Sequence, residues 1–402
     1  MRSAYIHLKS LIILLAFILQ NCLMVNSQFE PLARFWGVSN KQVPELLNRE
    51  KNLIIIDSKL RPLLDNSSFG GTYIDVIADK ININTVDPSK IDEVKISLNQ
   101  FQTHLNFIRV NNSLSQLNFN FNQIVKLSQN FSLTDSIISI EPEVNNVVIY
   151  LDDKDVKNKE FINSVKFLNP SINPFPRDET IFNRTNLIKK RQIHPIVYGG
   201  SKIVAFFRSM PTNCSAGFWM KKNNKDFILT AGHCTSLIPP PATFYLEDVD
   251  QIIGSMNDFS FVPNDMGFIE HLDNSIVQLR PIIRNFDSES SKILTYFIVD
   301  SSDITSAGIH VCKSGQKTGI TCGKVKAINA ESRTLLGTKK GVFRASMNSD
   351  GGDSGGAIYR YNNGDNPSLF VDAVGILVSG SNTAAGVPIR KAIDSGYDLV
   401  TI

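Results

Sequence analysis

The spacing of apolar residues changes near residue 195, and this change divides the chain into two unlike halves. In the first half, three segments space their apolar residues by three and four, which predicts amphipathic helices. They are residues 39–65, 87–101 and 155–168. Residues 70–86 and 145–153 instead alternate and are rich in β-branched side chains, which is typical of strands. We therefore expect a small α+β domain in this half.

The second half consists of short runs of strand type, separated by turns rich in Gly, Asn, Ser and Pro. The clearest runs are residues 226–232, 265–271, 309–315 and 370–380. Helical spacing is nearly absent until residues 386–400. Many short strands with frequent turns indicate an antiparallel barrel or sandwich, so the fold class is mainly β.

The most apolar run is residues 11–19, which follow the basic residues Arg2 and Lys9. Val25 and Ser27 then precede a plausible cleavage point before Gln28. A membrane anchor is the alternative, but it needs about 20 apolar residues and this run is shorter. We expect residues 1–27 to be a signal peptide, and the protein to be secreted to the extracellular space without a stable membrane anchor.

The chain has 402 residues and a net charge of +3, so its charge gives no reason to expect a nucleic-acid partner. Proline-rich and polar residues near position 175 predict an exposed connector between the halves. Residues 189–191 (Lys-Lys-Arg) are a candidate processing site, with a solvated charge cluster as the alternative. The expected domains after the signal peptide are residues 28–191 and 192–402.

Four cysteines remain after the signal peptide: Cys214, Cys234, Cys312 and Cys322. In an exported chain, four cysteines indicate two disulfides, with three possible pairings. A zinc site is the alternative, but no Cys-x-x-Cys pair supports it, and we expect no metal or other cofactor. Asn-x-Ser/Thr sequons predict a glycoprotein if the host glycosylates exported chains. They begin at Asn66, Asn111, Asn130, Asn183 and Asn213.

The glycine-rich run GGDSGGAIY at residues 351–359 contains a candidate nucleophile, Ser354, although a tight turn without chemistry would look similar. A serine needs a base, most often histidine. His233 is the best-placed candidate, because it follows an apolar run and has small neighbours. The other candidates in this half are His194, His271 and His310. No histidine follows Ser354, which excludes the α/β-hydrolase order and leaves histidine, acid, serine.

The segments LTAGHC and GDSGG together resemble the chymotrypsin-like serine proteases. The cysteine-containing segments around residues 214–234 and 312–322 are similar to the secreted proenzyme branch of α-lytic protease and the streptogrisins. The resemblance covers roughly residues 197–402. It implies a double six-stranded antiparallel β-barrel with a C-terminal helix, and disulfides Cys214–Cys234 and Cys312–Cys322.

The resemblance also implies the roles of individual residues. Ser354 would be the nucleophile and His233 the general base, with the Gly352 and Ser354 amides as the oxyanion hole. Asp265 would orient His233, and Asp258 is the alternative that sequence spacing leaves open. Asp353 would need a buried cation, which we expect to be Lys313 unless that lysine is only solvated.

The resemblance implies substrate-binding roles for Asn348, Ser379, Gly380 and Ser381. Asn348 stands where trypsin-like members place an aspartate, so we expect an apolar P1 residue, although Asp350 nearby weakens this argument. We expect a monomeric serine endopeptidase made as a zymogen and acting on proteins or peptides. Its residues 28–191 would be a pro-region that assists folding and inhibits the enzyme. The alternative is a non-catalytic homologue that binds partners through the cleft.

Overall fold

The computed structural model describes residues 29–402 with some gaps. The gaps are residues 132, 134, 153, 176–194, 209, 248–249, 274, 288–291, 363–367 and 381–382. The expected signal peptide, the cluster at 189–191, Asn183, His194 and Ser381 lie outside the described residues. Within the described part, no helix has the length and apolar character to cross a membrane.

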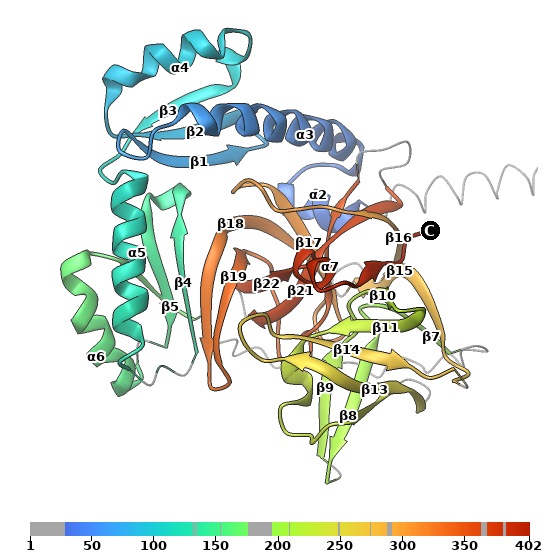
Figure 1. The fold of residues 1–402 in the computed structure, drawn as a ribbon. Coiled ribbons are helices and arrows are strands. Elements are labelled where there is room, and N and C mark those ends of the chain that lie inside the picture. Colours follow the sequence, from blue (N-terminus) through green and yellow to red (C-terminus); the bar gives the residue numbers. More distant parts are fainter. Residues whose placement is uncertain are drawn as a thin grey trace, which may run out of the picture.

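The N-terminal half contains two α+β units, the first at the top of Figure 1. Helix α3 lies along a three-stranded sheet in the order β1-β2-β3 and buries Leu46, Leu53 and Ile56. This burial explains the apolar spacing within residues 39–65 and confirms the predicted helix. The elements are α2 (Glu30–Trp36), α3 (Val43–Leu60), β1 (Phe69–Asp75), β2 (Lys80–Thr85), α4 (Ile91–Ser97) and β3 (Leu105–Arg109).

The second unit packs two helices on one face of a small sheet. Ser113 caps helix α5 by accepting a hydrogen bond from the Gln116 amide, and Ile124 packs against the sheet. The predicted strand at 145–153 and helix at 155–168 are both present. The elements are α5 (Leu114–Ser128), β4 (Ser136–Glu141), β5 (Asn146–Leu151), α6 (Val156–Val165) and β6 (Ser171–Pro174).

The C-terminal half contains two β-structures, and the first is antiparallel throughout. Its strand order is β23-β10-β11-β14-β13-β12-β8-β9, and its interior includes Leu229, Phe244 and Met256. The C-terminal strand β23 therefore pairs with a strand from the start of this half. The bounds are β8 (Lys202–Phe207), β9 (Met210–Ser215), β10 (Trp219–Lys222), β11 (Lys225–Thr230), β12 (Ala242–Leu246), β13 (Gln251–Ser260), β14 (Met266–His271) and β23 (Asp398–Leu399).

The second β-structure is a closed ring of six antiparallel strands, β17-β18-β19-β22-β21-β20, and it agrees with one predicted six-stranded barrel. Short helix α7 (Arg390–Asp394) follows the ring near the C-terminus, as predicted. The strands are β17 (His310–Gly315), β18 (Gly319–Thr334), β19 (Gly337–Ala345), β20 (Ala357–Tyr361), β21 (Phe370–Gly380) and β22 (Ala384–Pro388).

Three further strands extend this ring and depart from the predicted antiparallel pattern. Strand β16 pairs in parallel with β21, and β7 pairs in parallel with β15. The long segments between these pairs make such parallel pairing possible. The strands are β7 (Ile196–Gly199), β15 (Gln278–Asp287) and β16 (Lys292–Ser301).

One sheet connects the two halves of the chain. Strand β4 of the N-terminal half pairs antiparallel with β18, where Ser139 lies opposite Ala330 and Ser136 opposite Arg333. Figure 1 shows β4 and β5 beside the long β18–β19 hairpin. The N-terminal half is therefore docked on the edge of the β18–β19 hairpin, and both strands of this hairpin belong to the closed ring.

Candidate active site

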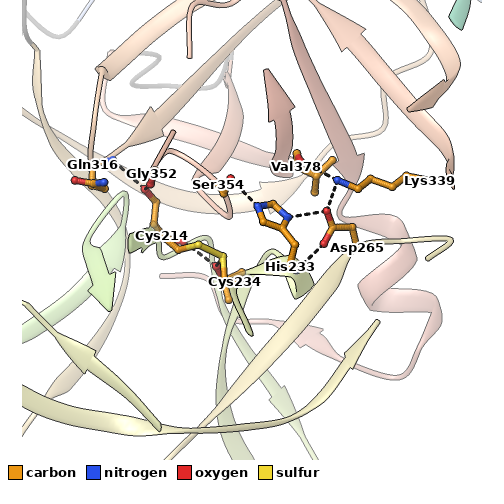
Figure 2. Close-up of a disulfide and its surroundings, with 11 residues drawn as sticks. Cys214, His233, Cys234, Asp265, Gln316, Lys339, Gly352, Ser354 and Val378 are labelled. Carbon is orange, nitrogen blue, oxygen red and sulfur yellow. Dashed lines mark hydrogen bonds and ion pairs between the residues drawn. A yellow bond between two sulfur atoms is a disulfide. The ribbon is translucent and has the colours of Figure 1, made fainter. Parts of the chain in front are cut away.

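Three predicted residues from separate loops meet between the two β-structures. His233 lies on the 3₁₀ turn Gly232–Thr235 after β11, Asp265 directly precedes β14, and Ser354 lies in the loop before β20. The His233 Nδ1 atom is 2.8 Å from Asp265 Oδ2, and Nε2 is 2.8 Å from Ser354 Oγ (Figure 2). A ring that donates Nδ1–H to the carboxylate leaves Nε2 to accept the serine proton.

The environment of Asp265 explains why it remains charged although it is fully buried. Its Oδ1 accepts a hydrogen bond of 2.8 Å from the His233 amide. Burial alone would disfavour the carboxylate, but His233 and Lys339 hold the pKa of Asp265 below its usual range. Asp258, the alternative, instead accepts a hydrogen bond from the Tyr397 hydroxyl. Of the two aspartates, the structure brings Asp265 to His233.

Asp353 directly precedes Ser354 in the loop before β20, which we call the serine loop. It forms a buried ion pair with Lys313. The Lys313 Nζ atom lies 3.1 Å from Asp353 Oδ2, and both side chains are fully buried. Asp353 also accepts hydrogen bonds from the Lys317 amide and from both the amide and the hydroxyl of Thr318. These donors outweigh burial and lower the pKa of Asp353. The Lys313–Asp353 contact expected from the sequence is present.

The glycines of this loop allow a close approach between chain segments. Gly352 has φ +103° and Gly355 has φ +82°, both in the region that favours glycine. A Cβ on Gly355 would clash with Thr230 Oγ1. Ser215 holds the loop by donating its hydroxyl to the Gly352 carbonyl and its amide to the Ser354 carbonyl. In the described part of the chain, no group accepts a hydrogen bond from the Gly352 or Ser354 amide.

Two disulfides support the same region. Cys214–Cys234 joins the end of β9 to the turn that carries His233, as Figure 2 shows. Cys312–Cys322 links the neighbouring strands β17 and β18. These are the two pairings that the resemblance implies. Across the described residues, no group of three His, Cys, Asp or Glu side chains is arranged to hold a metal ion.

The predicted pocket residues occupy two adjoining segments. The Asn348 carbonyl accepts a hydrogen bond from Thr321, whereas its buried side-chain Oδ1 has no partner among the described residues. Ser379 and Gly380 end strand β21, and a side chain at Gly380 would clash with Ser349 Oγ. The two segments therefore touch beside the serine loop.

Comparisons with known proteins bear on this site, although no family model matches the chain. Serine protease 1 of Streptomyces fradiae is 29% identical over 50% of this chain, and the match spans 49% of that relative's length. Glutamyl endopeptidase 2 of Streptomyces griseus is 28% identical over 40% of this chain and 74% of its own length. Part of the chain is therefore similar in sequence to known proteases.

Two further matches differ in their extent. Streptogrisin-D of Streptomyces griseus is 25% identical over 75% of this chain and 69% of its own length, so the match extends beyond the C-terminal half. The solved structure of Thermobifida fusca Protease A covers 52% of this chain and 100% of that chain, at 24% identity with a TM-score of 0.42.

Sequence reasoning missed two features of the C-terminal half. Lys339 places its Nζ 2.6 Å from Asp265 Oδ2, and nothing near residue 339 in the sequence indicates this contact. A cavity of about 380 Å³ also adjoins the serine loop. Its lining includes Gly351, Gly352, Lys202, Asn213, Gln316 and Lys317. Asn213 was noted only as a sequon, and a glycan there would crowd this cavity.

Proposed function

We propose that the protease half is a serine endopeptidase in which Ser354 attacks the peptide carbonyl. His233 takes the Oγ proton and then donates it to the leaving amine, which yields an acyl-enzyme on Ser354. Water, deprotonated by His233, hydrolyses that ester. Asp265 orients the ring and stabilises the imidazolium. The hydrogen-bonded series from Ser354 to Asp265 is the observation that carries this proposal.

The oxyanion hole is assigned to the amides of Gly352 and Ser354. The positive φ of Gly352 and the Ser215 hydrogen bonds to both neighbouring carbonyls support this assignment, because they fix the orientation of the loop. The Lys313–Asp353 ion pair supports the loop from within. Each oxyanion donor contributes about 3–4 kcal/mol to transition-state stabilisation.

The chain is proposed to be a secreted zymogen, with a signal peptide at 1–27, a pro-region at 28–191 and the protease domain at 192–402. The pro-region would assist folding and inhibit the monomeric enzyme until cleavage near residues 189–191. The pairing of β4 with β18 supports this role, as does the buried Glu50, which contacts His310 across the halves. Slow folding of long-range β topologies gives such a helper a physical purpose.

The proposed P1 preference is for apolar residues. Asn348 supports it, because a neutral amide provides no charge to pair with Arg or Lys. The relative named glutamyl endopeptidase makes an acidic P1 residue the competing possibility. Cleavage of a peptide library by the mature protein, read by mass spectrometry, separates the two preferences.

Fluorophosphonate labelling of the secreted protein tests the proposed function, with mass spectrometry locating the adduct and the mature N-terminus. We expect an adduct on Ser354 that is lost in His233→Ala and formed about 10⁴-fold more slowly in Asp265→Asn, which holds the ring in the wrong tautomer. His271→Ala is the matched control, because His271 contacts the Val277 carbonyl instead. A chain cleaved near residue 191 that takes no label would instead indicate the non-catalytic binding homologue.

A further inference from the structure

Lys339 is a buried cation in direct contact with Asp265, the aspartate of the proposed triad Ser354, His233 and Asp265. Its side chain is only 2% exposed, and its Nζ donates to Asp265 Oδ2 at 2.6 Å and to the Val378 carbonyl at 3.0 Å (Figure 2). The same Oδ2 accepts the hydrogen bond from His233. The ammonium and the imidazole therefore share one carboxylate oxygen.

We propose that Lys339 is a positioning residue for Asp265, and that its charge opposes protonation of His233. This inference rests on the proposed function, since it concerns the base of the proposed reaction. With Lys339 in place, the carboxylate is held toward the ring, and His233 stays neutral, and so able to accept the serine proton, down to a lower pH.

The donors around Asp265 explain the positioning effect. The His233 amide holds Oδ1, while Lys339 and the His233 ring hold Oδ2, so the carboxylate cannot rotate without losing a charged hydrogen bond. Hydrogen bonds to charged groups contribute more than neutral ones. A buried ammonium without partners would be costly, and the carboxylate together with the Val378 carbonyl offsets that cost.

The charge effect follows from the same geometry. Because the ammonium lies near the ring and away from water, its repulsion of a second positive charge is only weakly screened. Two further charged groups near Lys339 are Asp135 of the N-terminal half and the neighbouring Lys340. Partial burial raises the pKa of Asp135, which lies before β4, and attraction to Lys339 reduces this upward shift. Lys340 pairs with Glu331 at 4.0 Å on the hairpin itself.

The hairpin that carries Lys339 is fastened to the loop that carries Asp265. The Lys340 amide donates to the Pro263 carbonyl at 3.0 Å, and a side chain at Gly337 would press on Val262. The other strand of the hairpin, β18, pairs with β4 of the N-terminal half. The β18–β19 hairpin therefore contacts both β4 of the N-terminal half and Asp265.

A measurement that needs no turnover tests the charge effect. The intact chain with Ser354→Ala cannot process itself through Ser354, and the low-field NMR resonance of its His233 Nδ1 proton reports ring protonation as the pH is changed. In this background we expect both Lys339→Met and Lys339→Gln to raise the midpoint pH by about one unit. Lys339→Arg keeps the charge and should keep the parent midpoint. Lys340→Met, which removes a neighbouring exposed charge, is the matched control and should also leave it unchanged.

Kinetics with Ser354 present test the positioning effect. We expect Lys339→Met to lower kcat about tenfold and to shift the acid limb of the kcat/KM profile upward by about one pH unit. Lys339→Gln keeps a donor, so it should show the same shift with a smaller loss of kcat. Midpoints equal to the parent value in both neutral variants would overturn the inference.

Fluorophosphonate labelling and the NMR titration together separate this inference from the proposed function. A wild-type chain that is cleaved near residue 191 and still takes no fluorophosphonate label overturns the proposed function, while the NMR midpoints still decide the role of Lys339. If Lys339→Met is not recovered folded, Lys339→Gln decides the outcome, because it retains a polar side chain of similar length.

Discussion

Two buried lysine–aspartate pairs lie near Ser354, and they differ in what surrounds the carboxylate. Asp353 receives Lys313 together with the amides and hydroxyl of one short loop. Asp265 receives Lys339 and the two donors of His233. In the first pair, no donor gains or loses a proton during the proposed reaction. In the second pair, one donor is His233, the base that gains and loses a proton.

This difference separates a structural ion pair from one coupled to chemistry. The Lys313–Asp353 pair should affect stability and the shape of the serine loop, with little influence on how activity depends on pH. The Lys339–Asp265 pair should affect that pH dependence directly. Burial alone does not distinguish them, because all four side chains are nearly inaccessible to water.

The largest expected effect on stability comes from Lys313→Met, which leaves Asp353 buried and without its cation. We expect the free energy of unfolding to fall by about 3–5 kcal/mol, measured by urea denaturation. Lys221→Met is the control, since Lys221 is exposed at the surface, where it pairs with Asp226 and lies over the Trp219 ring. Equal unfolding midpoints for the two variants would contradict a structural role for the Lys313 pair.

A third buried carboxylate, Glu50, sharpens the comparison because it comes from the N-terminal half. Its Oε2 lies 2.6 Å from His310 Nδ1 and 2.7 Å from Arg360. These partners outweigh burial and lower the pKa of Glu50 to about 2. Burial lowers the pKa of His310, whose Nε2 accepts the Tyr361 amide proton and is therefore unprotonated.

Both shifts predict weaker docking of the N-terminal half in acid. The depressed pKa of His310 contributes stability above its ordinary value of 6.5, and this is lost as the pH falls through the depressed pKa. Glu50 adds a second loss as the pH falls from 4.5 toward 2. We expect Glu50→Gln in the Ser354→Ala chain to cost about 2 kcal/mol at pH 7. Hydrogen exchange of the β17 amides in the Ser354→Ala chain tests the weaker docking in acid. We expect less protection at pH 5 than at pH 7, and equal protection at both would argue against it.

The smallest effect is expected at Glu143, which is about one-third exposed and pairs with Lys324 and Lys326 at the base of the hairpin. The two lysines outweigh partial burial and lower the pKa of Glu143. Because water and salt screen these pairs, Glu143→Ala should cost under about 1 kcal/mol, and less still in high salt. A loss as large as that of Glu50→Gln, persisting in high salt, would show that exposure is a poor guide here.

Strongly periodic segments of the fold were predictable from the sequence. Helix α3 and strands β11 and β21 follow apolar patterns that match their burial. Helix α5 was not predicted, since its three asparagines are weak helix formers. It forms because Leu117 and Ile124 are buried against the neighbouring sheet. Tertiary packing therefore overrides local propensity at this helix.

The site divides in a similar way. His233 and Ser354 lie in short motifs with small neighbours, so a local signal identifies them. Lys339 lies on a polar hairpin, and its contact depends on how that hairpin meets the loop before β14. The pairing of β4 with β18 joins residues nearly two hundred positions apart, and no local pattern indicates the partner. Contacts of this kind are set by the fold as a whole.

If the N-terminal half is removed, as proposed, the pairing of β4 with β18 determines which strand edge becomes exposed. Without β4, residues 330–333 would keep their backbone partners in β19 but lose those in β4, so that β18 would become an edge strand at these residues. Leu335, 85% exposed at the tip of the same hairpin, would lie beside that edge. An unpaired edge strand is a template for pairing with any extended chain, including the same edge of a second copy of the protein. The proposed mature protein would therefore expose an unpaired strand edge that β4 covers in the intact chain.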